Sequence, residues 1–161
     1  MLAAVTLGGV RRIAWITEVK WELIRPDPLD LADLNLCELD LAVRDSMTDQ
    51  FLITSILVNV LASKIIAERW EKSQGGNQDD NYVNAVKHCT WSCEMTQRNG
   101  EKSAWEWGEA HECNDKGVPK TDASSHMDRH NNEAGRFYGK SKGDCLKTCK
   151  FDPLSRLQHK P

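Results

Sequence analysis

Six cysteines constrain this chain of 161 residues more than any other feature, because four of them form two pairs with the same spacing. Cys89 and Cys93 are four residues apart, and so are Cys145 and Cys149. On a helix, that spacing places both members of a pair on one face. Two such helices can pack together and be joined by two disulfides, which is typical of proteins in an oxidising compartment. The pattern favours a helical domain with disulfide staples.

The spacing leaves two questions about the cysteines open. Cys37 and Cys113 either pair with each other or remain free once the other four are joined. Zinc coordination is the alternative to disulfides, although zinc knuckles usually separate their cysteines by two residues rather than three. We expect Cys89 and Cys93 to pair with Cys145 and Cys149, in an order that the spacing does not settle.

Apolar periodicity predicts a mostly α-helical protein, a compact bundle of four or five helices. The predicted helices lie at about 46–72, 81–98, 104–113 and 125–138, followed by a short helix that contains Cys145 and Cys149. Ser103 and Ser125 are each followed three residues later by an acidic residue. This pattern, a capping box, predicts that helices begin there. Residues 46–161 are therefore expected to form the helical domain.

Residues 1–45 are expected to form an N-terminal lead-in of uncertain structure. Residues 4–10 and 13–24 contain β-formers with some alternation and are candidate strands. Residues 29–43 alternate leucine with polar residues, which fits either a strand or a leucine-rich helix. Both a strand and a helix therefore remain open for this part of the lead-in.

The segment 51–66 is the most apolar part of the chain. It is shorter than a membrane span requires, and Asn59 and Lys64 interrupt it. We therefore expect it to be a buried core helix with these two residues at its polar edge. The alternative is a membrane-inserting segment of a pore-forming protein.

Charge and the first residues restrict the possible partners and locations. The formal net charge of −3 offers no basic patch for nucleic acid, so no nucleic-acid partner is expected. The apolar start precedes Arg11 and Arg12, which is the reverse of the order in a cleavable signal peptide. The chain is expected to remain inside the cell, to leave by another route, or to be a piece of a longer protein.

Polar side chains occupy three of the predicted helices where a packed helix normally shows apolar ones. The candidate catalytic residues are His88, His111, Glu112, Asp128 and His130, and the candidate substrate-binding residues are Asn131 and Asn132. Gly108 and Gly135 are costly inside helices, so we expect them to allow close helix packing. On this argument His88, His111 and Asp128 share one pocket, with Asn131 or Asn132 on its wall.

Three kinds of site fit these residues. A divalent metal ion is one option for a cofactor, with His88, His111 and Asp128 as candidate ligands. Without a metal, His88 or His111 would act as a general base oriented by Asp128, with asparagine amides donating to an oxyanion. The third option is a hydrogen-bond network that only ties the helices together. His126 and His130 also have metal-pair spacing, but His126 lies in a first turn, where we expect exposure.

At these motifs the chain resembles a bacterial family of C-terminal domains found at the ends of RHS-repeat and related polymorphic toxin proteins. The family pattern consists of an (N/D)AxRHxxW helix, an AHE helix and an MDxHNNxxG helix. The matching runs here begin at Asn84, Ala110 and Met127, and Lys87 replaces the arginine of the first motif. The resemblance covers about residues 80–150.

The resemblance implies a toxin or effector domain that is released from a larger RHS-type carrier chain and delivered to a competitor or host cell. It implies a cognate immunity protein as a partner and action in an oxidising compartment such as the periplasm. The family provides no activity to carry over. We expect hydrolysis of an envelope component such as membrane phospholipid. A pore-forming toxin that uses residues 51–66, or a non-enzymatic binding module, is the alternative.

Overall fold

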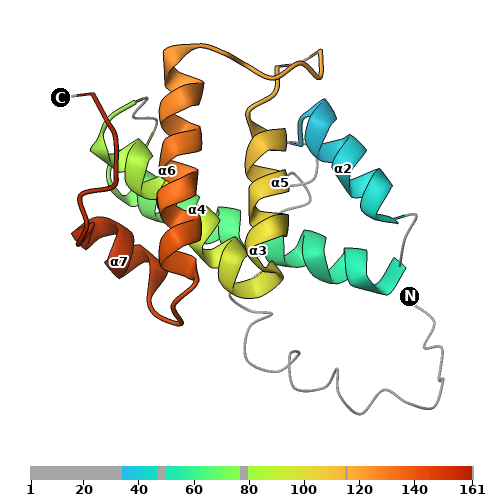
Figure 1. The fold of residues 1–161 in the computed structure, drawn as a ribbon, viewed down its shortest axis with the longest axis horizontal. Coiled ribbons are helices and arrows are strands. Elements are labelled where there is room, and N and C mark those ends of the chain that lie inside the picture. Colours follow the sequence, from blue (N-terminus) through green and yellow to red (C-terminus); the bar gives the residue numbers. More distant parts are fainter. Residues whose placement is uncertain (1–33, 47–49, 77–79, 115, 161) are drawn as a thin grey trace.

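The protein is mostly α-helical, as a computed structural model shows for residues 34–46, 50–76, 80–114 and 116–160 (Figure 1). The six helices in these residues are α2 (Leu36–Ser46), α3 (Gln50–Ser73), α4 (Tyr82–Asn99), α5 (Glu101–His111), α6 (Ala123–Gly139) and α7 (Cys145–Phe151). The mostly α prediction is confirmed. There is one helix more than the expected four or five, because α2 forms within the predicted lead-in. The candidate strands at 4–10 and 13–24 lie outside the described residues.

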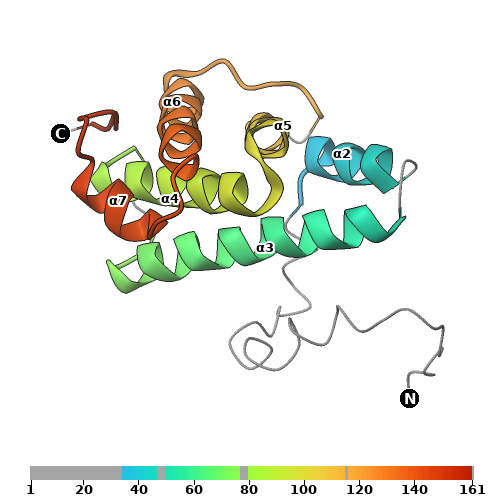
Figure 2. The ribbon, with the colours of Figure 1, turned by 60° about the horizontal axis from the view of Figure 1, so that its bottom comes forward.

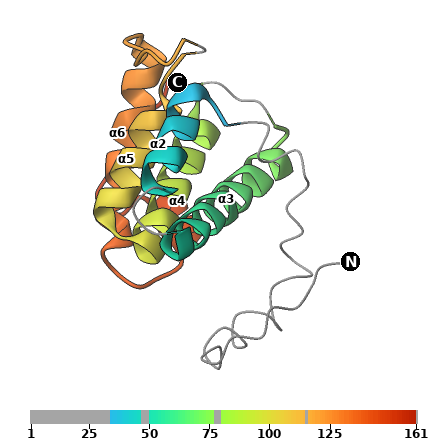
Figure 3. The ribbon, with the colours of Figure 1, turned by 90° about the vertical axis from the view of Figure 1, so that its right-hand side faces the viewer.

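Helix α4 is the centre of the molecule. It runs beside α3, while α5 and α6 lie side by side and cross its opposite side (Figures 1 and 2). Viewed from a third direction, α4 lies between α3 and the pair of α5 and α6 (Figure 3). Residues on α4 are therefore covered on two sides, and eleven of its residues are buried. This position explains how polar groups on α4 come to lie inside the protein.

Three disulfides fasten the helices. Cys89 pairs with Cys149 and Cys93 pairs with Cys145, so the expected connection between α4 and α7 is confirmed. The third disulfide joins Cys37 on α2 to Cys113, just after α5, and leaves no cysteine free. The zinc alternative for the cysteines is therefore wrong. Three disulfides are consistent with an oxidising compartment.

Two glycines of α6 allow it to lie unusually close to α4. A Cβ atom added at Gly135 would lie 2.3 Å from the carbonyl oxygen of Cys89. One added at Gly139 would lie 2.7 Å from the carbonyl oxygen of Cys93. Gly108 on α5 is different, because a Cβ there would be 3.5 Å from Asn132, an ordinary contact. The close-packing argument thus holds for Gly135 and not for Gly108.

Helix α3 packs along α4, and one of its faces lies in the core. Val60, Leu61 and Ala62 are buried, whereas Val58 is exposed. Asn59 donates a hydrogen bond to Asn99 at the end of α4, and Lys64 lies near Glu68. Among the described residues, no helix is both long and apolar enough to cross a membrane.

The helices begin at residues other than the predicted caps. Helix α5 begins at Glu101, directly after Gly100, which ends α4 with a φ of 86°, so Ser103 lies inside the helix. Helix α6 begins after Asp122, whose side chain accepts a hydrogen bond from the backbone N–H of Ser125. Both predicted capping boxes are wrong, because the residue before each helix, Gly100 or Asp122, lies three positions earlier than the predicted serine.

Candidate functional site

The polar residues of three helices meet at one pocket of about 180 Å³. It is lined by Asp80, Asn84, Lys87, His88, His111, Glu112, Lys120, Ser124 and Asp128. His88 comes from α4, Asp128 from α6, and His111 and Glu112 from the end of α5. The three side chains that we expected to meet, His88, His111 and Asp128, thus line the same pocket.

His88 is buried at the inner side of this pocket. Its Nε2 lies 3.3 Å from Oδ1 of Asp128. Burial lowers the pKa of His88 well below its ordinary value, and repulsion by Lys87, and by His111 when that ring is protonated, lowers it further. At neutral pH the imidazole is therefore uncharged, the state in which it can bind a metal or accept a proton.

Asp128 and Glu112 form an acidic corner beside His88. Ligand atoms of these three residues all lie within 4.8 Å of one another. Burial raises the pKa of Asp128 to about 7, and the negative charge of Glu112 adds to this effect. Burial also raises the pKa of Glu112. With the Asn84 amide oriented so that Nδ2 faces Asp128, Nδ2 donates a hydrogen bond to Asp128 Oδ1 at 2.9 Å.

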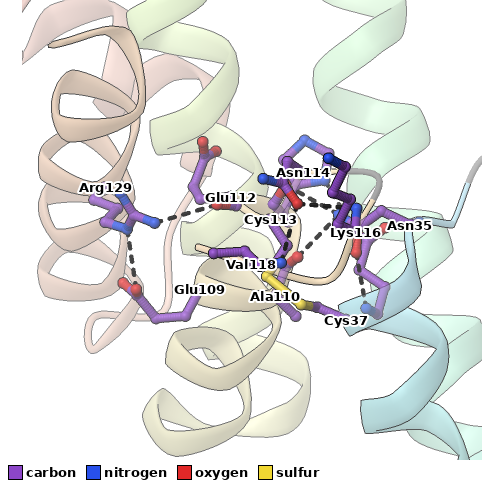
Figure 4. The surroundings of a disulfide bond; sticks show 12 residues. Asn35, Cys37, Glu109, Ala110, Glu112, Cys113, Asn114, Lys116, Val118 and Arg129 are labelled. Carbon is purple, nitrogen blue, oxygen red and sulfur yellow. Dashed lines mark hydrogen bonds and ion pairs between the residues drawn. A yellow bond between two sulfur atoms is a disulfide. The ribbon is translucent and has the colours of Figure 1, made fainter. Parts of the chain in front are cut away.

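Glu112 is directed into this corner by its place at the end of α5. Figure 4 shows that its carboxylate points away from the neighbouring disulfide of Cys113. Arg129 on α6 donates to the Glu112 backbone carbonyl and pairs with Glu109 one turn earlier (Figure 4). The end of α5 is thus fixed against α6, which holds the Glu112 backbone in place.

His111 also lines the pocket, with its ring centroid 6.2 Å from that of His88, and it has a carboxylate partner of its own. Its Nδ1 lies 2.9 Å from Oε1 of Glu38 on α2. The Glu38 side chain is 2% exposed, while that of His111 is 32% exposed. Burial alone would raise the pKa of Glu38, but the hydrogen bond from His111, and the charge of that ring when it is protonated, outweigh burial, and the pKa is lowered. An ionised, buried carboxylate therefore orients an accessible histidine.

Sequence reasoning missed Glu38 because the residue lies in the predicted lead-in. A usable signal was present, since Asn35 and Glu38 form a capping box. The Asn35 side chain accepts from the Glu38 N–H at 3.0 Å, and the Asn35 N–H donates back to Glu38 at 2.9 Å. Asn35 also donates to the backbone carbonyls of Ala110 and His111. This box and the disulfide of Cys37 place Glu38 beside His111.

Two of the predicted site residues lie elsewhere. Asn131 exchanges two hydrogen bonds with the backbone of Gln158, at 2.9 Å and 2.8 Å. His130 bonds through Nε2 to the carbonyl oxygen of Arg156 at 2.8 Å. Both residues hold the C-terminal segment on α6, as in the hydrogen-bond network that we considered as an alternative. They do not line the pocket.

Asn132 and His126 complete the set of candidates. Asn132 is buried and lies beside His88, on the inner side of the site. His126 is exposed, as expected for the first turn of a helix, and it does not line the pocket. The pocket therefore combines four of the five candidate catalytic residues with Glu38 behind His111.

Residues 47–152 match a family described as a domain of unknown function, DUF6973. The matched segment contains every residue that lines the pocket, whereas Glu38 lies before it. No curated protein and no solved structure matches the chain. The family assignment therefore covers the pocket and names no activity.

Proposed function

The chain belongs to the DUF6973 family, a domain of unknown function, and we propose that it is a hydrolase in which His111, oriented by Glu38, activates water. One observation carries the proposal. The His111–Glu38 pair, 2.9 Å apart, borders the same pocket as the corner formed by His88, Glu112 and Asp128. A base held by a buried carboxylate, facing a second set of polar groups, is one of the arrangements that support hydrolysis.

The roles of the two imidazole nitrogens follow from the hydrogen bond. The ionised carboxylate of Glu38 can only accept, so Nδ1 of His111 donates to it. This leaves Nε2 as the nitrogen with a free lone pair, which can take a proton from water. The imidazolium that forms is stabilised by the charge of Glu38. His111 is thus the general base, and Glu38 is a positioning residue.

The remaining pocket residues suit a substrate that develops or carries negative charge. Lys87 and Lys120 line the pocket, and lysine is a common binder of phosphate oxygens. Lys87 is held by Glu71 at 3.0 Å, which fixes its position at the pocket. A phosphoester or a carboxylic ester with a polar headgroup fits this lining. We therefore favour an envelope lipid such as phospholipid as the substrate.

The proposed hydrolase acts as a toxin or effector outside a reducing cytoplasm. Support comes from the three disulfides and from the resemblance to domains at the ends of RHS-type toxin proteins. In this proposal a larger carrier chain delivers the domain to a competitor or host cell. A cognate immunity protein then protects the producing cell by blocking the pocket.

The test combines growth and product release. The protein is produced in a bacterium with and without export to the periplasm, and lipids are analysed by mass spectrometry. We expect growth arrest and lysolipid or headgroup release with export, and neither with His111→Ala. His126→Ala is the matched control, because this exposed histidine lies outside the pocket. Its activity should equal that of the wild type.

Three outcomes would contradict the proposal. Equal product release from His111→Ala and wild type, with both proteins folded, would show that His111 is not the general base. Depolarisation of the target membrane without any released product would instead support the pore-forming alternative. Growth arrest with neither effect would leave a binding module as the explanation.

A further inference from the structure

We propose that His88, Glu112 and Asp128 bind a first-row divalent metal ion, Zn²⁺ or Mn²⁺, at the inner side of the pocket. The inference deepens the proposed function, since the ion would lie in the hydrolytic pocket, but it is tested separately. The three side chains come from α4, the end of α5 and α6, and each offers one ligand atom within 4.8 Å of the others. One ion would therefore tie three elements together.

The spacing is close to that of a formed metal site. Nitrogen and oxygen ligands lie about 2.0–2.2 Å from Zn²⁺, so neighbouring ligand atoms of a tetrahedral site are about 3.4 Å apart. His88 Nε2 and Asp128 Oδ1 are already 3.3 Å apart. The three ligand atoms all lie within 4.8 Å of one another, so the farthest one would have to move by on the order of 1 Å to reach this spacing. A rotation of the Glu112 side chain can supply that shift.

The two carboxylates of this corner, Glu112 and Asp128, favour a bound cation. Glu112 is buried, Asp128 is largely so, and two carboxylates at this distance cannot both be ionised without a compensating charge. Lys87, which acts on Asp128, is already paired with Glu71 at 3.0 Å. A divalent ion neutralises both carboxylates at once.

A second, independent observation comes from behind His88. Neither His88 Nδ1 nor the two polar atoms of the Asn132 amide makes a hydrogen bond of ordinary length within the described residues, although all three are buried. Asn132 lies beside this imidazole. An ion on Nε2 would fix the ring proton on Nδ1, with the Asn132 oxygen as its acceptor. Histidine ligands of metals almost always have such a partner.

The ligand types select the class of ion. One imidazole with two carboxylates suits Zn²⁺ or Mn²⁺, whereas Ca²⁺ and Mg²⁺ prefer oxygen ligands alone. Three protein ligands leave at least one coordination position open, as in catalytic rather than structural sites. That position opens to the pocket that His111 borders. The ion would thus hold a water molecule or the substrate on the side of the pocket where His111, the proposed base, lies.

The experiment measures binding without activity. The full chain is treated with a chelator, then titrated with Zn²⁺, Mn²⁺, Mg²⁺ or Ca²⁺ by calorimetry and thermal melting. We expect one Zn²⁺ or Mn²⁺ per chain, and a Tm increase of about 5 to 10 °C at a free-ion concentration about 100 times Kd. Mg²⁺ and Ca²⁺ should shift the Tm far less.

Near-isosteric variants locate the site. Asp128→Asn and Glu112→Gln should each weaken Zn²⁺ or Mn²⁺ binding by more than about tenfold. Glu133→Gln is the matched control, because this exposed carboxylate lies on α6 outside the pocket and the cluster. His111→Ala should keep the ion while losing hydrolysis.

The inference is overturned by either of two results. One is the absence of a stoichiometric site for every ion in the wild type. The other is binding by Asp128→Asn and Glu112→Gln with the affinity of Glu133→Gln, which would mean adventitious binding elsewhere. If His111→Ala loses hydrolysis but the wild type binds no metal, the metal site is refuted and the proposed hydrolase is retained. If the wild type binds the metal but hydrolyses no lipid, the proposed function is refuted and the metal site is retained.

Discussion

Glu38 uses its two carboxylate oxygens for two different partners, and this double use explains its burial. Oε2 accepts from the Asn35 N–H, and Oε1 accepts from His111 Nδ1. The first bond begins α2, and the second orients the histidine of the pocket. A buried carboxylate is costly unless it is paired in this way. The residue therefore links a local helix start to the proposed catalytic group.

The lowered pKa of Glu38 predicts a pH dependence of stability. A carboxyl whose folded-state pKa is depressed contributes stability above its unfolded pKa of about 4.3. This contribution is lost as the pH falls through the folded pKa, because the unfolded chain then binds more protons. The free energy of unfolding should therefore fall more steeply from about pH 5 to pH 3 in the wild type than in Glu38→Gln. Urea denaturation at several pH values measures the difference, and parallel curves would contradict it.

At the scale of the elements, the contact between α4 and α6 depends on glycine. A methyl group at Gly135 would collide with the carbonyl oxygen of Cys89, which is part of the backbone and cannot turn aside. Gly135→Ala should therefore push the helices apart and lower the free energy of unfolding by about 3 kcal/mol or more. Gly143→Ala is the control, since nothing lies within 4 Å of its added Cβ. It should change stability by less than about 0.5 kcal/mol.

Chemical denaturation of the two glycine variants gives both values. An equal effect of the two substitutions would mean that the helix contact relaxes freely around the added methyl. Since Asp128 lies on α6 and His88 on α4, separation of these helices should also lengthen the distance between their side chains. We therefore expect Gly135→Ala to weaken the metal binding proposed above.

Helix α2 is held to the rest of the molecule by the disulfide between Cys37 and Cys113. The bond closes a separation of 76 residues and neighbours Glu38. Replacing both cysteines by serine should cost about 4 kcal/mol in the chain-entropy model. It should also reduce hydrolysis, because Glu38 would no longer be fixed beside His111.

The control for this variant removes a different disulfide. The double variant Cys93→Ser with Cys145→Ser opens a separation of 52 residues and leaves α2 attached. Its stability loss should be similar, but hydrolysis at a temperature where it remains folded should be less affected. Equal losses of hydrolysis in the two double variants would show that α2 does not act on the site through Glu38.

At the scale of the whole molecule, the burial of one face of α3 predicts a protein that leaves membranes intact. Val60, Leu61 and Ala62 lie in the core, so exposing them to lipid would require the bundle to open. We expect no release of dye from phospholipid vesicles before lipid products are formed. Leakage that precedes any product would favour the pore-forming alternative and would mean that α3 leaves the core.

The parts of this fold that follow from local spacing could be predicted from the sequence. The one-turn spacing of Cys89 and Cys93 is a property of one helix, and it identified the connection to α7. The pocket was likewise predictable, because His88, His111 and Asp128 lie on faces that helix periodicity defines. The first residues of α5 and α6 were harder to predict, because Gly100 and Asp122, which precede these helices, lie only a few residues from serines that also fit a helix start.

The parts that depend on distant segments could not be predicted. Glu38 reaches His111 only because a disulfide and a capping box bring α2 to the end of α5. Asn131 and His130 belong to a polar motif, but the C-terminal segment takes up their hydrogen bonds. No periodicity within α6 distinguishes a side chain that faces the pocket from one that holds this segment.

The central claim is that Glu38 acts on hydrolysis through His111, and a double-mutant cycle tests it most directly. The values of kcat/KM are measured for the wild type, Glu38→Gln, His111→Ala and the double variant. His111→Ala should lose about 100- to 10,000-fold, and Glu38→Gln should lose at least about tenfold. The double variant should be no slower than His111→Ala, because Glu38 has no role without the histidine. Losses that multiply in the double variant would contradict the account.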